Sequence, residues 1–368
     1  MDNKMIRGIG AAVLVTVWLA LTLCGWFLPA KETSEAERRP LAQMPEIKTE
    51  TILNGKFMTE FESYTLDQFP LRDVFRKIKA LFHYNVLNQS DNNDIYIADG
   101  YAAKLEYPMN QTSVDHALKR FNYLYDKLLK GRCPNVYMTV VPDKSYYLAE
   151  ENGYLAMDYE AMFQAMAEGM PWAEFVDITG CLTAEDYYRT DTHWRQEKLL
   201  GVAEKLCQAM GAAMSKAEDF TATALERPFY GVYYGQAALP MEPETMYIME
   251  SDLLSSCRVY DYETGKYSQV YDESKLTSKD LYDVYLSGAR SLLTIENPNA
   301  ATNRELIVFR DSFGSSIVPL LVQGYAKVTL VDIRYINIEV LDRFITFRGQ
   351  DVLFLYSTLV LNNSSTIK

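Results

Sequence analysis

Histidine is scarce in this chain of 368 residues: only His83, His116 and His193 occur. They are far apart in sequence and no H-E-x-x-H motif is present, so we expect no metal site and no other cofactor. His83 and His116 lie in helical patterns, where packing or surface roles are expected. His193 is therefore the one histidine left as a candidate for chemistry.

Cysteine is also sparse, with five residues and no C-x-x-C motif, which excludes a zinc ribbon and a thioredoxin-like site. Cys24 lies in an apolar run near the N-terminus. The wide spacing of the other four favours buried free thiols, with disulfides as the alternative if the domain lies outside the membrane. These four are Cys133, Cys181, Cys207 and Cys257.

Clustered positive charge is missing as well. Lysine and arginine form no block after the first few residues, and the formal net charge is −13. Binding to nucleic acid phosphates needs clustered cations, so we expect no nucleic acid partner. Hydrophobic residues, by contrast, make up 48% of the chain, which is typical of a globular protein with a substantial core.

The run from Gly8 to Ala30 contains no charged residue. About 20 apolar residues are enough to span a bilayer. Lys4 and Arg7 precede the run, and such positive flanks stay in the cytoplasm. The sequence therefore predicts a single-pass protein of the plasma membrane, with most of the chain outside the cytoplasm.

The predicted layout is a cytoplasmic tail at residues 1–7, a transmembrane anchor at 8–30 and a linker at 31–49. A cleaved signal peptide is the alternative to the anchor, but its apolar core is usually shorter, about 7–15 residues, and ends in small residues. This run is longer and ends with Trp26 and Phe27.

Residues 50–368 are predicted to form the extracytoplasmic domain. A helical pattern runs from Glu50 to Phe82, and residues 220–290, which are rich in tyrosine and turn residues, are expected to be an irregular insertion. After about Asp94, short apolar segments alternate with amphipathic helices, which predicts a three-layer α/β/α fold with a mostly parallel sheet. The expected strands are Val136–Val141, Glu174–Ile178, Leu306–Phe309, Lys327–Val331 and Val352–Tyr356, and the expected helices are Val114–Lys130, Met157–Gly169, Trp194–Met210 and Gly314–Gln323.

His193 follows Asp191 by two residues, just before a predicted helix. In extended chain, residues two apart face the same way. The Asp191 carboxylate would then orient the imidazole and stabilise its protonated form during proton transfer. The alternative is that Asp191 or Thr192 caps the helix.

Ser312 is placed between the predicted strand Leu306–Phe309 and the predicted helix beginning at Gly314. Ligands of open α/β sheets bind at the carboxyl ends of strands, and a helix start supplies free N–H groups that suit an oxyanion. A serine nucleophile there needs a base, and His193 is the candidate. The alternative is a helix cap by Asp311 or Ser312. G-x-S-x-G is absent, so an α/β-hydrolase elbow is not supported.

These segments together resemble a known family. Asp191-Thr192-His193-Trp194 resembles the signature of the DHHW family, with threonine in place of the first histidine. That family is related to the SGNH-like alginate O-acetyltransferases, in which an Asp-x-His pair precedes the nucleophilic serine. Further blocks, spread over residues 55–360, resemble the family in the same order: Phe69–Asp73, Val141–Lys144, Phe229–Gly231 and Val331–Tyr335.

The resemblance implies an SGNH-hydrolase-like fold in which Ser312 is the nucleophile, His193 the general base and Asp191 the residue that orients it. The Ser312 backbone N–H is the implied oxyanion donor, while the glycine and asparagine donors of ordinary SGNH enzymes have no clear counterpart. Candidate substrate-binding residues are Arg334, Tyr335, Lys144 and Trp194. For Arg334 and Tyr335 packing is the alternative, and for Lys144 a solvated position at a strand end.

The implied activity is O-acyl transfer, in the first place acetyl transfer, to a cell-surface or exported polysaccharide through an acyl-enzyme on Ser312. The family often works beside a multipass membrane O-acyltransferase, which implies such a partner as the acyl donor. A carbohydrate acetyl esterase with the same residues is the first alternative. A non-catalytic glycan-binding scaffold of an envelope assembly is the second.

Overall fold

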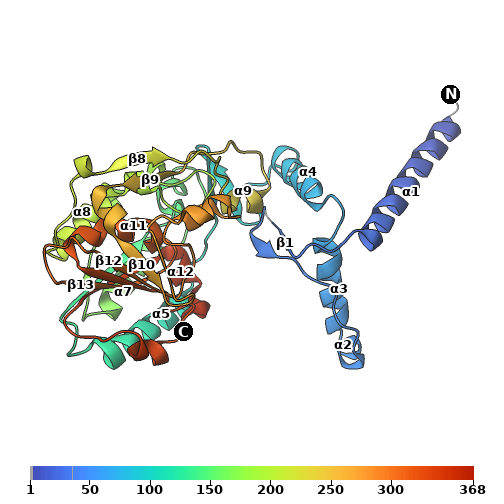
Figure 1. The fold of residues 1–368 in the computed structure, drawn as a ribbon. Coiled ribbons are helices and arrows are strands. Elements are labelled where there is room, and N and C mark those ends of the chain that lie inside the picture. Colours follow the sequence, from blue (N-terminus) through green and yellow to red (C-terminus); the bar gives the residue numbers. More distant parts are fainter. Residues whose placement is uncertain (1–2, 35) are drawn as a thin grey trace. The chain divides into compact units, whose positions relative to one another are not determined.

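The computed structural model describes residues 3–34 and 36–368 (Figure 1). They form two compact units. The larger unit comprises Asp94–Tyr233 and Met241–Lys368, and the smaller one comprises the residues up to Asn93 together with Tyr234–Pro240. The predicted domain beginning at residue 50 is thus divided differently, because the helices between residues 50 and 85 group with the N-terminal segment. Met1 and Asp2 of the predicted cytoplasmic tail lie outside the described residues.

The larger unit is built on an eight-stranded sheet with the order β11-β10-β12-β14-β13-β15-β6-β7. The strands from β14 to β7 pair in parallel, whereas β12, β10 and β11 extend one edge by antiparallel pairing. The strands are β6 (Asn135–Val141), β7 (Glu174–Phe175), β10 (Arg258–Asp261), β11 (Lys266–Ser268), β12 (Leu292–Glu296), β13 (Glu305–Arg310), β14 (Lys327–Val331) and β15 (Asp351–Ser357).

Two hydrophobic clusters cover the two faces of this sheet. Leu306 and Val308 of β13 belong to the cluster that contains α8 and α11, and Ile307 and Phe309 belong to the cluster that contains α5 and α7. The strands are therefore buried on both faces, which explains their continuous apolar sequences. This arrangement confirms the predicted three-layer α/β/α fold class with a mostly parallel sheet (Figure 1).

Most predicted helices occur within a few residues of their expected limits, and side-chain caps fix two of them. The Asn110 side chain accepts a hydrogen bond from Ser113 N at the start of α5, and Asp158 accepts one from Ala161 N at the start of α7. The remaining elements of the larger unit are β4 (Ile95–Ala98), β5 (Tyr101–Lys104), α5 (Gln111–Leu124) with the π-helical turn Tyr125–Leu129, α6 (Ser145–Leu148), α7 (Tyr159–Gly169), α8 (Leu200–Ala209), β8 (Thr221–Ala224), β9 (Tyr247–Glu250), α10 (Asp252–Ser256), α11 (Gly314–Leu321) and α12 (Thr358–Asn362).

Among the sequence-based expectations that differ from the structure, two concern the larger unit. The helix expected from Trp194 begins at Leu200, because Trp194 forms an antiparallel bridge with Tyr187 and keeps the preceding segment extended. Residues 220–290 are not wholly irregular. They contribute β10 and β11 to the main sheet and form the separate pair β8–β9.

The smaller unit contains α1 (Asn3–Phe27), whose segment Arg7–Gly25 has a mean hydropathy of 2.0 and is long and apolar enough to cross a membrane. Its helical pattern after residue 50 is broken into three helices. The other elements are β1 (Thr33–Ser34), β2 (Arg39–Pro40), α2 (Thr49–Leu53), α3 (Lys56–Asp67), α4 (Arg72–Asn85) and β3 (Asp91–Asn92), while α9 (Val232–Ala237) contributes its last residues.

Candidate active site

A tight loop between Tyr187 and Trp194 carries the Asp-x-His pair. The two ends of the loop form an antiparallel bridge, and Tyr188 N donates to His193 O at 3.1 Å. Asp191 and His193 therefore lie in non-helical chain, as a contact between them requires. The Asp191 side chain does not cap α8, which begins nine residues later.

Asp191, His193 and Ser312 form a chain of hydrogen bonds. His193 Nδ1 lies 2.6 Å from Asp191 Oδ1, and His193 Nε2 lies 2.8 Å from Ser312 Oγ. Because the carboxylate only accepts, Nδ1 carries the proton and Nε2 is left to accept from the serine hydroxyl. Asp191 is fully buried and His193 is 8% exposed, so the pair is largely shielded from water.

The Asp191 carboxylate is held by backbone donors in addition to the imidazole. His193 N donates to Oδ1 at 3.0 Å and Val232 N to Oδ2 at 2.7 Å. The neighbouring Gly231 fits only because it lacks a side chain: a Cβ there would lie 2.2 Å from Thr190 O and 2.3 Å from Asp191 Cβ. Gly231 thus packs directly against the loop and donates to Thr190 Oγ1 at 2.9 Å, while the residue after it, Val232, supplies the donor to the Asp191 carboxylate.

Glu244 fixes the loop from a segment that the sequence did not single out. Its carboxylate accepts from Arg189 N and Thr190 N, each at 2.8 Å, and from Thr190 Oγ1 at 2.9 Å. No periodicity or motif marks this residue, because it acts across more than 50 positions of the chain.

Ser312 lies at the carboxyl end of β13, between two parallel neighbours, in the turn that leads into α11. The turn is held by Asp311, whose Oδ2 accepts from Ser357 N and Oγ at 2.7 and 2.6 Å and whose Oδ1 accepts from Phe313 N at 3.0 Å. Neither Asp311 nor Ser312 is the N-cap of α11, which is Phe313. Among the described residues, none accepts a hydrogen bond from Ser312 N, which remains available as a donor.

Tyr282 and Ser316 support the imidazole from its flat side. The ring of Tyr282 stacks on that of His193, and its hydroxyl lies 2.7 Å from Ser316 Oγ. Ser316 Oγ also accepts from Trp194 Nε1 at 2.9 Å. This bond links the residue after His193 to the helix that follows Ser312. Tyr282 comes from the 220–290 segment and carried no sequence signal.

Lys144 is buried. The alternative given for it in the sequence analysis, a solvated position at a strand end, is therefore wrong. Lys144 is 1% exposed, and its Nζ donates to Tyr188 O at 2.7 Å and to Arg189 O at 3.3 Å. Burial lowers the pKa of Lys144 to about 7, although the nearby Asp191 and Glu244 charges act in the opposite direction. Lys144 and Glu244 therefore hold the same loop: Lys144 donates to its carbonyl oxygens, and Glu244 accepts from its N–H groups.

The other three substrate-binding candidates are placed differently. Trp194 is fully buried, and its Nε1 hydrogen bonds assign it to packing. Arg334 forms a two-pronged ion pair with Asp332, with Nε and Nη2 at 2.9 and 2.6 Å. Tyr335 is half exposed and stacks against the Arg334 guanidinium. None of the three touches Asp191, His193 or Ser312 by a hydrogen bond among the described residues.

The remaining side chains that could take part in metal or redox chemistry are the acidic residues and the cysteines. Within residues 3–34 and 36–368, no cluster of three or more His, Cys, Asp or Glu side chains could hold a metal ion. Cys133, Cys207 and Cys257 are buried free thiols. Burial raises the pKa of each of them, which makes them poor nucleophiles.

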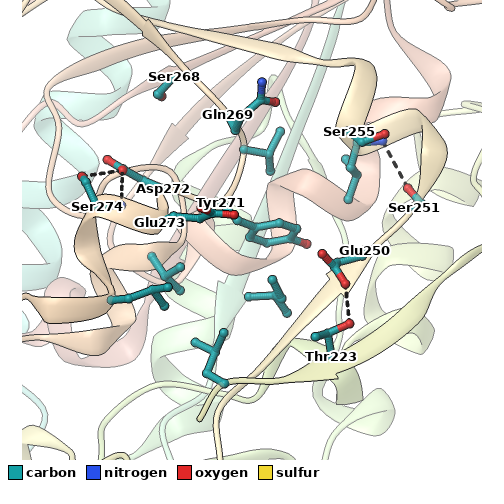
Figure 2. A pocket seen from close by; sticks show the side chains of 16 residues that line it. Thr223, Glu250, Ser251, Ser255, Ser268, Gln269, Tyr271, Asp272, Glu273 and Ser274 are labelled. Carbon is teal, nitrogen blue, oxygen red and sulfur yellow. Dashed lines mark hydrogen bonds between the residues drawn. The ribbon is translucent and has the colours of Figure 1, made fainter. Parts of the chain in front are cut away.

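A cavity of about 610 Å³ lies near β9 and the loop that follows β11 (Figure 2). Glu250, Asp272 and Gln269 line it together with several serines. Tyr271 also lines it, and the Tyr271 hydroxyl donates to Met249 O at 2.7 Å. None of the predicted site residues lines this cavity.

Comparison with known proteins finds a match to one family model over part of the chain and several solved structures with a similar fold. Residues 175–331 match the family model described as DHHW protein, and the matched range contains Asp191, His193 and Ser312. The resemblance to the DHHW family seen in the sequence is thus confirmed. A comparison with curated proteins finds no match.

Several solved structures are similar. A DHHW family protein from Eubacterium siraeum DSM 15702 is 22% identical with a TM-score of 0.60, over 75% of this chain and 95% of that one. PatB1 of Bacillus cereus with a sulfonyl adduct is 17% identical with a TM-score of 0.57, over 73% of this chain and 95% of that one. A second structure of PatB1 from Bacillus cereus has a TM-score of 0.55 at 19% identity, over 73% of this chain and 96% of that one. At these identities the similarity establishes a common fold.

Proposed function

We propose that this chain, with its match to the DHHW family model, is a membrane-anchored enzyme that transfers an O-acetyl group to a cell-surface or exported polysaccharide. The observation that carries the proposal is the hydrogen-bond chain from Asp191 through His193 to Ser312, with separations of 2.6 and 2.8 Å. Such an arrangement activates a serine hydroxyl for attack on an acyl carbonyl.

In the proposed first step, Ser312 Oγ attacks the acetyl carbonyl carbon while His193 Nε2 takes the hydroxyl proton. The tetrahedral intermediate collapses by expelling the donor's oxygen, which receives that proton from His193, and an acetyl ester on Ser312 remains. In the second step an acceptor hydroxyl attacks this ester and gives its proton to Nε2, which returns it to Ser312 Oγ. No net proton or electron is required.

Two features of the site support this sequence of steps. Asp191 is fully buried and stabilises the imidazolium that forms twice per cycle. The Ser312 N–H, without an internal acceptor among the described residues, is the proposed oxyanion donor.

The predicted anchor supports a location at the plasma membrane, with α1 crossing the bilayer and the larger unit outside the cytoplasm. A domain outside the cytoplasm has no direct access to acetyl-CoA. We therefore propose a multipass membrane O-acyltransferase as the acyl donor partner and an exported polysaccharide as the acceptor.

The test is an acetyl-adduct experiment on the detergent-solubilised full chain. A small activated acetyl ester is added, and intact mass with peptide mapping locates the adduct in wild type, Ser312→Ala and His193→Ala. Ser315→Ala, which removes a neighbouring buried serine, is the matched control. We expect an adduct on Ser312 in wild type and in the control, and in neither active-site variant.

A sulfonyl fluoride is a useful second probe, because sulfonyl reagents react with activated serine hydroxyls. Absence of any adduct with both reagents would overturn the catalytic proposal. Adding polysaccharide acceptors to the acetylated enzyme then separates transfer to sugar from hydrolysis by water, which would indicate an esterase.

A further inference from the structure

Helix α4 carries an exposed apolar face. Val74, Phe75, Ile78, Leu81 and Phe82 are each between 41% and 57% exposed. At about 100° per residue, these five side chains fall within about 120° of the helix circumference. A soluble helix normally buries such a stripe against a core, and the only buried residue of α4 is Ala80, on a different side.

The opposite face of α4 is already occupied within the smaller unit. Arg72 and Arg76 pair with Glu37, and Arg76 Nη2 also donates to Gly235 O at 2.9 Å. Burial of Ala80 completes this contact. The packing therefore fixes the rotation of the helix, and the apolar stripe is held facing outward.

Lysines stand on both borders of the stripe. At about 100° per residue, Lys77 lies about 40° beyond one border and Lys79 about 40° beyond the other. Their long side chains can extend from an apolar surface to a charged one. Both arginines of α4 pair with Glu37 on the other face, so the two lysines are the cations beside the stripe, in a chain whose formal net charge is −13. This local reversal of charge is complementary to an anionic surface.

The same unit ties α4 to the end of the predicted membrane helix. The Lys31 N–H donates to Gln68 Oε1 at 2.8 Å, and Gln68 Nε2 donates to Lys31 O at 2.9 Å. A Cβ placed on Gly25 would lie 3.7 Å from Pro70 Cδ. The residues just before α4 thus contact the C-terminal end of α1, which keeps the start of α4 close to the point where α1 leaves the apolar layer.

We propose that α4 is an interfacial helix that lies on the outer leaflet with Val74, Phe75, Ile78, Leu81 and Phe82 in the acyl region and Lys77 and Lys79 at anionic lipid headgroups. This inference rests on the proposed anchoring by α1 and is independent of the proposed chemistry. A helix with one apolar face bordered by cations binds in the plane of the membrane, and anionic lipid strengthens the binding.

The test uses the full chain in lipid nanodiscs, with an environment-sensitive fluorophore on one introduced cysteine. The background variant carries Cys24→Ser and Cys181→Ser, since the other cysteines are buried. Ile78→Cys reports the apolar face. Asp73→Cys, outside the apolar stripe, is the control, because both positions are open to water without a membrane: the Ile78 residue is 57% exposed and the Asp73 side chain 56%.

In discs containing phosphatidylglycerol, we expect blue-shifted emission at position 78 and quenching by nitroxide lipids there, but neither at position 73. Replacing Lys77 and Lys79 by glutamine should lower the ratio of embedded to water-exposed label about five-fold per lysine. In purely zwitterionic discs this dependence on the lysines should disappear.

Two negative results have different meanings. A chain retained in the disc with a water-exposed label at position 78 would overturn the interfacial helix alone, and would point to a protein partner for the stripe. A chain that does not stay with the disc would overturn the anchor, and the interfacial helix with it. Either result leaves the acetyl-adduct test of Ser312 unaffected.

Discussion

The ring of Tyr282 lies parallel to the imidazole of His193, with the ring centroids 3.9 Å apart and 12° between the planes. Burial raises the pKa of Tyr282 well above its usual value, so the phenol stays neutral beside the base. The stack restricts rotation of the imidazole about its link to the backbone. It thereby keeps Nε2 directed at Ser312 while Nδ1 stays on Asp191.

This relationship predicts a difference between two substitutions. Tyr282→Phe keeps the stack and loses only the contact with Ser316, so kcat should fall by less than about ten-fold. Tyr282→Leu removes the flat surface and should lower kcat by roughly 10–100-fold, because small misplacements of a base are costly. Steady-state hydrolysis of an activated acetyl ester measures both. Equal losses in the two variants would contradict the positioning role of the ring.

Asp191→Asn should lower kcat by about 10⁴-fold while leaving the fold intact. The amide can hold the imidazole only in the wrong tautomer and cannot stabilise the imidazolium. The measurement is single-turnover acetylation of Ser312, compared with thermal unfolding of the same sample. An active Asp191→Asn enzyme would exclude His193 as the general base held by this carboxylate.

Gly231→Ala should disrupt the site by steric pressure alone. The new methyl group meets Thr190 O and Asp191 Cβ at distances far below van der Waals contact. We expect a loss of about 1–3 kcal/mol in the free energy of unfolding, with a loss of activity larger than that destabilisation explains. Denaturant titration and the ester assay provide the two readouts.

The control for this variant is Gly201→Ala, at an exposed helical position with no atom within 4 Å of the added Cβ. It should raise the free energy of unfolding by up to about 1 kcal/mol and leave activity unchanged.

Lys144→Met should cost about 1–3 kcal/mol, because the carbonyls of Tyr188 and Arg189 lose their buried donor. The loop that carries Asp191 and His193 would loosen, so kcat should fall more than KM rises. Lys144→Arg is the comparison: the larger guanidinium has no room in a site that is 1% exposed, and we expect no rescue.

The same residue predicts a pH dependence of stability. The pKa of Lys144 is lowered by burial to about 7 in the folded state, against about 10.4 for an unfolded lysine. Between these values the unfolded state binds more protons, so the contribution of Lys144 to the free energy of unfolding rises with pH and is smallest below about pH 7.

Denaturant titrations of wild type and Lys144→Met at about pH 6 and about pH 9 check this sign. The advantage of wild type over the variant should be larger at the higher pH. A difference that does not change with pH would mean that the ammonium group is not desolvated in the folded protein.

Much of the sheet was predictable because its strands are short, apolar and buried on both faces. Leu306–Phe309 and Lys327–Val331 are examples in which local sequence and tertiary environment agree. The strands β10 and β11 were missed, since tyrosines and charges at the edge of a sheet give no continuous apolar run. The early start assigned to the helix at Trp194 had a similar cause: a tertiary bridge overrode the helical pattern.

At the candidate site, the Asp-x-His spacing and the strand-to-helix position of Ser312, together with the resemblance to the DHHW family, selected the three side chains that the structure brings together. The contacts that hold these three side chains in place could not be predicted from the sequence. Glu244, Tyr282 and the buried orientation of Lys144 depend on contacts between distant segments, and no local pattern encodes such contacts. Trp194 was selected by its neighbours in sequence, yet its indole points into the core.

The base and the nucleophile are 119 residues apart in the chain, and each is carried by a turn held by its own set of hydrogen bonds. A partial opening that frees either turn separates Nε2 from Oγ while most of the sheet stays paired. On heating, acyl transfer should then disappear at a lower temperature than the circular dichroism of the helices. Enzyme turnover would thus report the loosening of two turns that bulk spectroscopy does not detect.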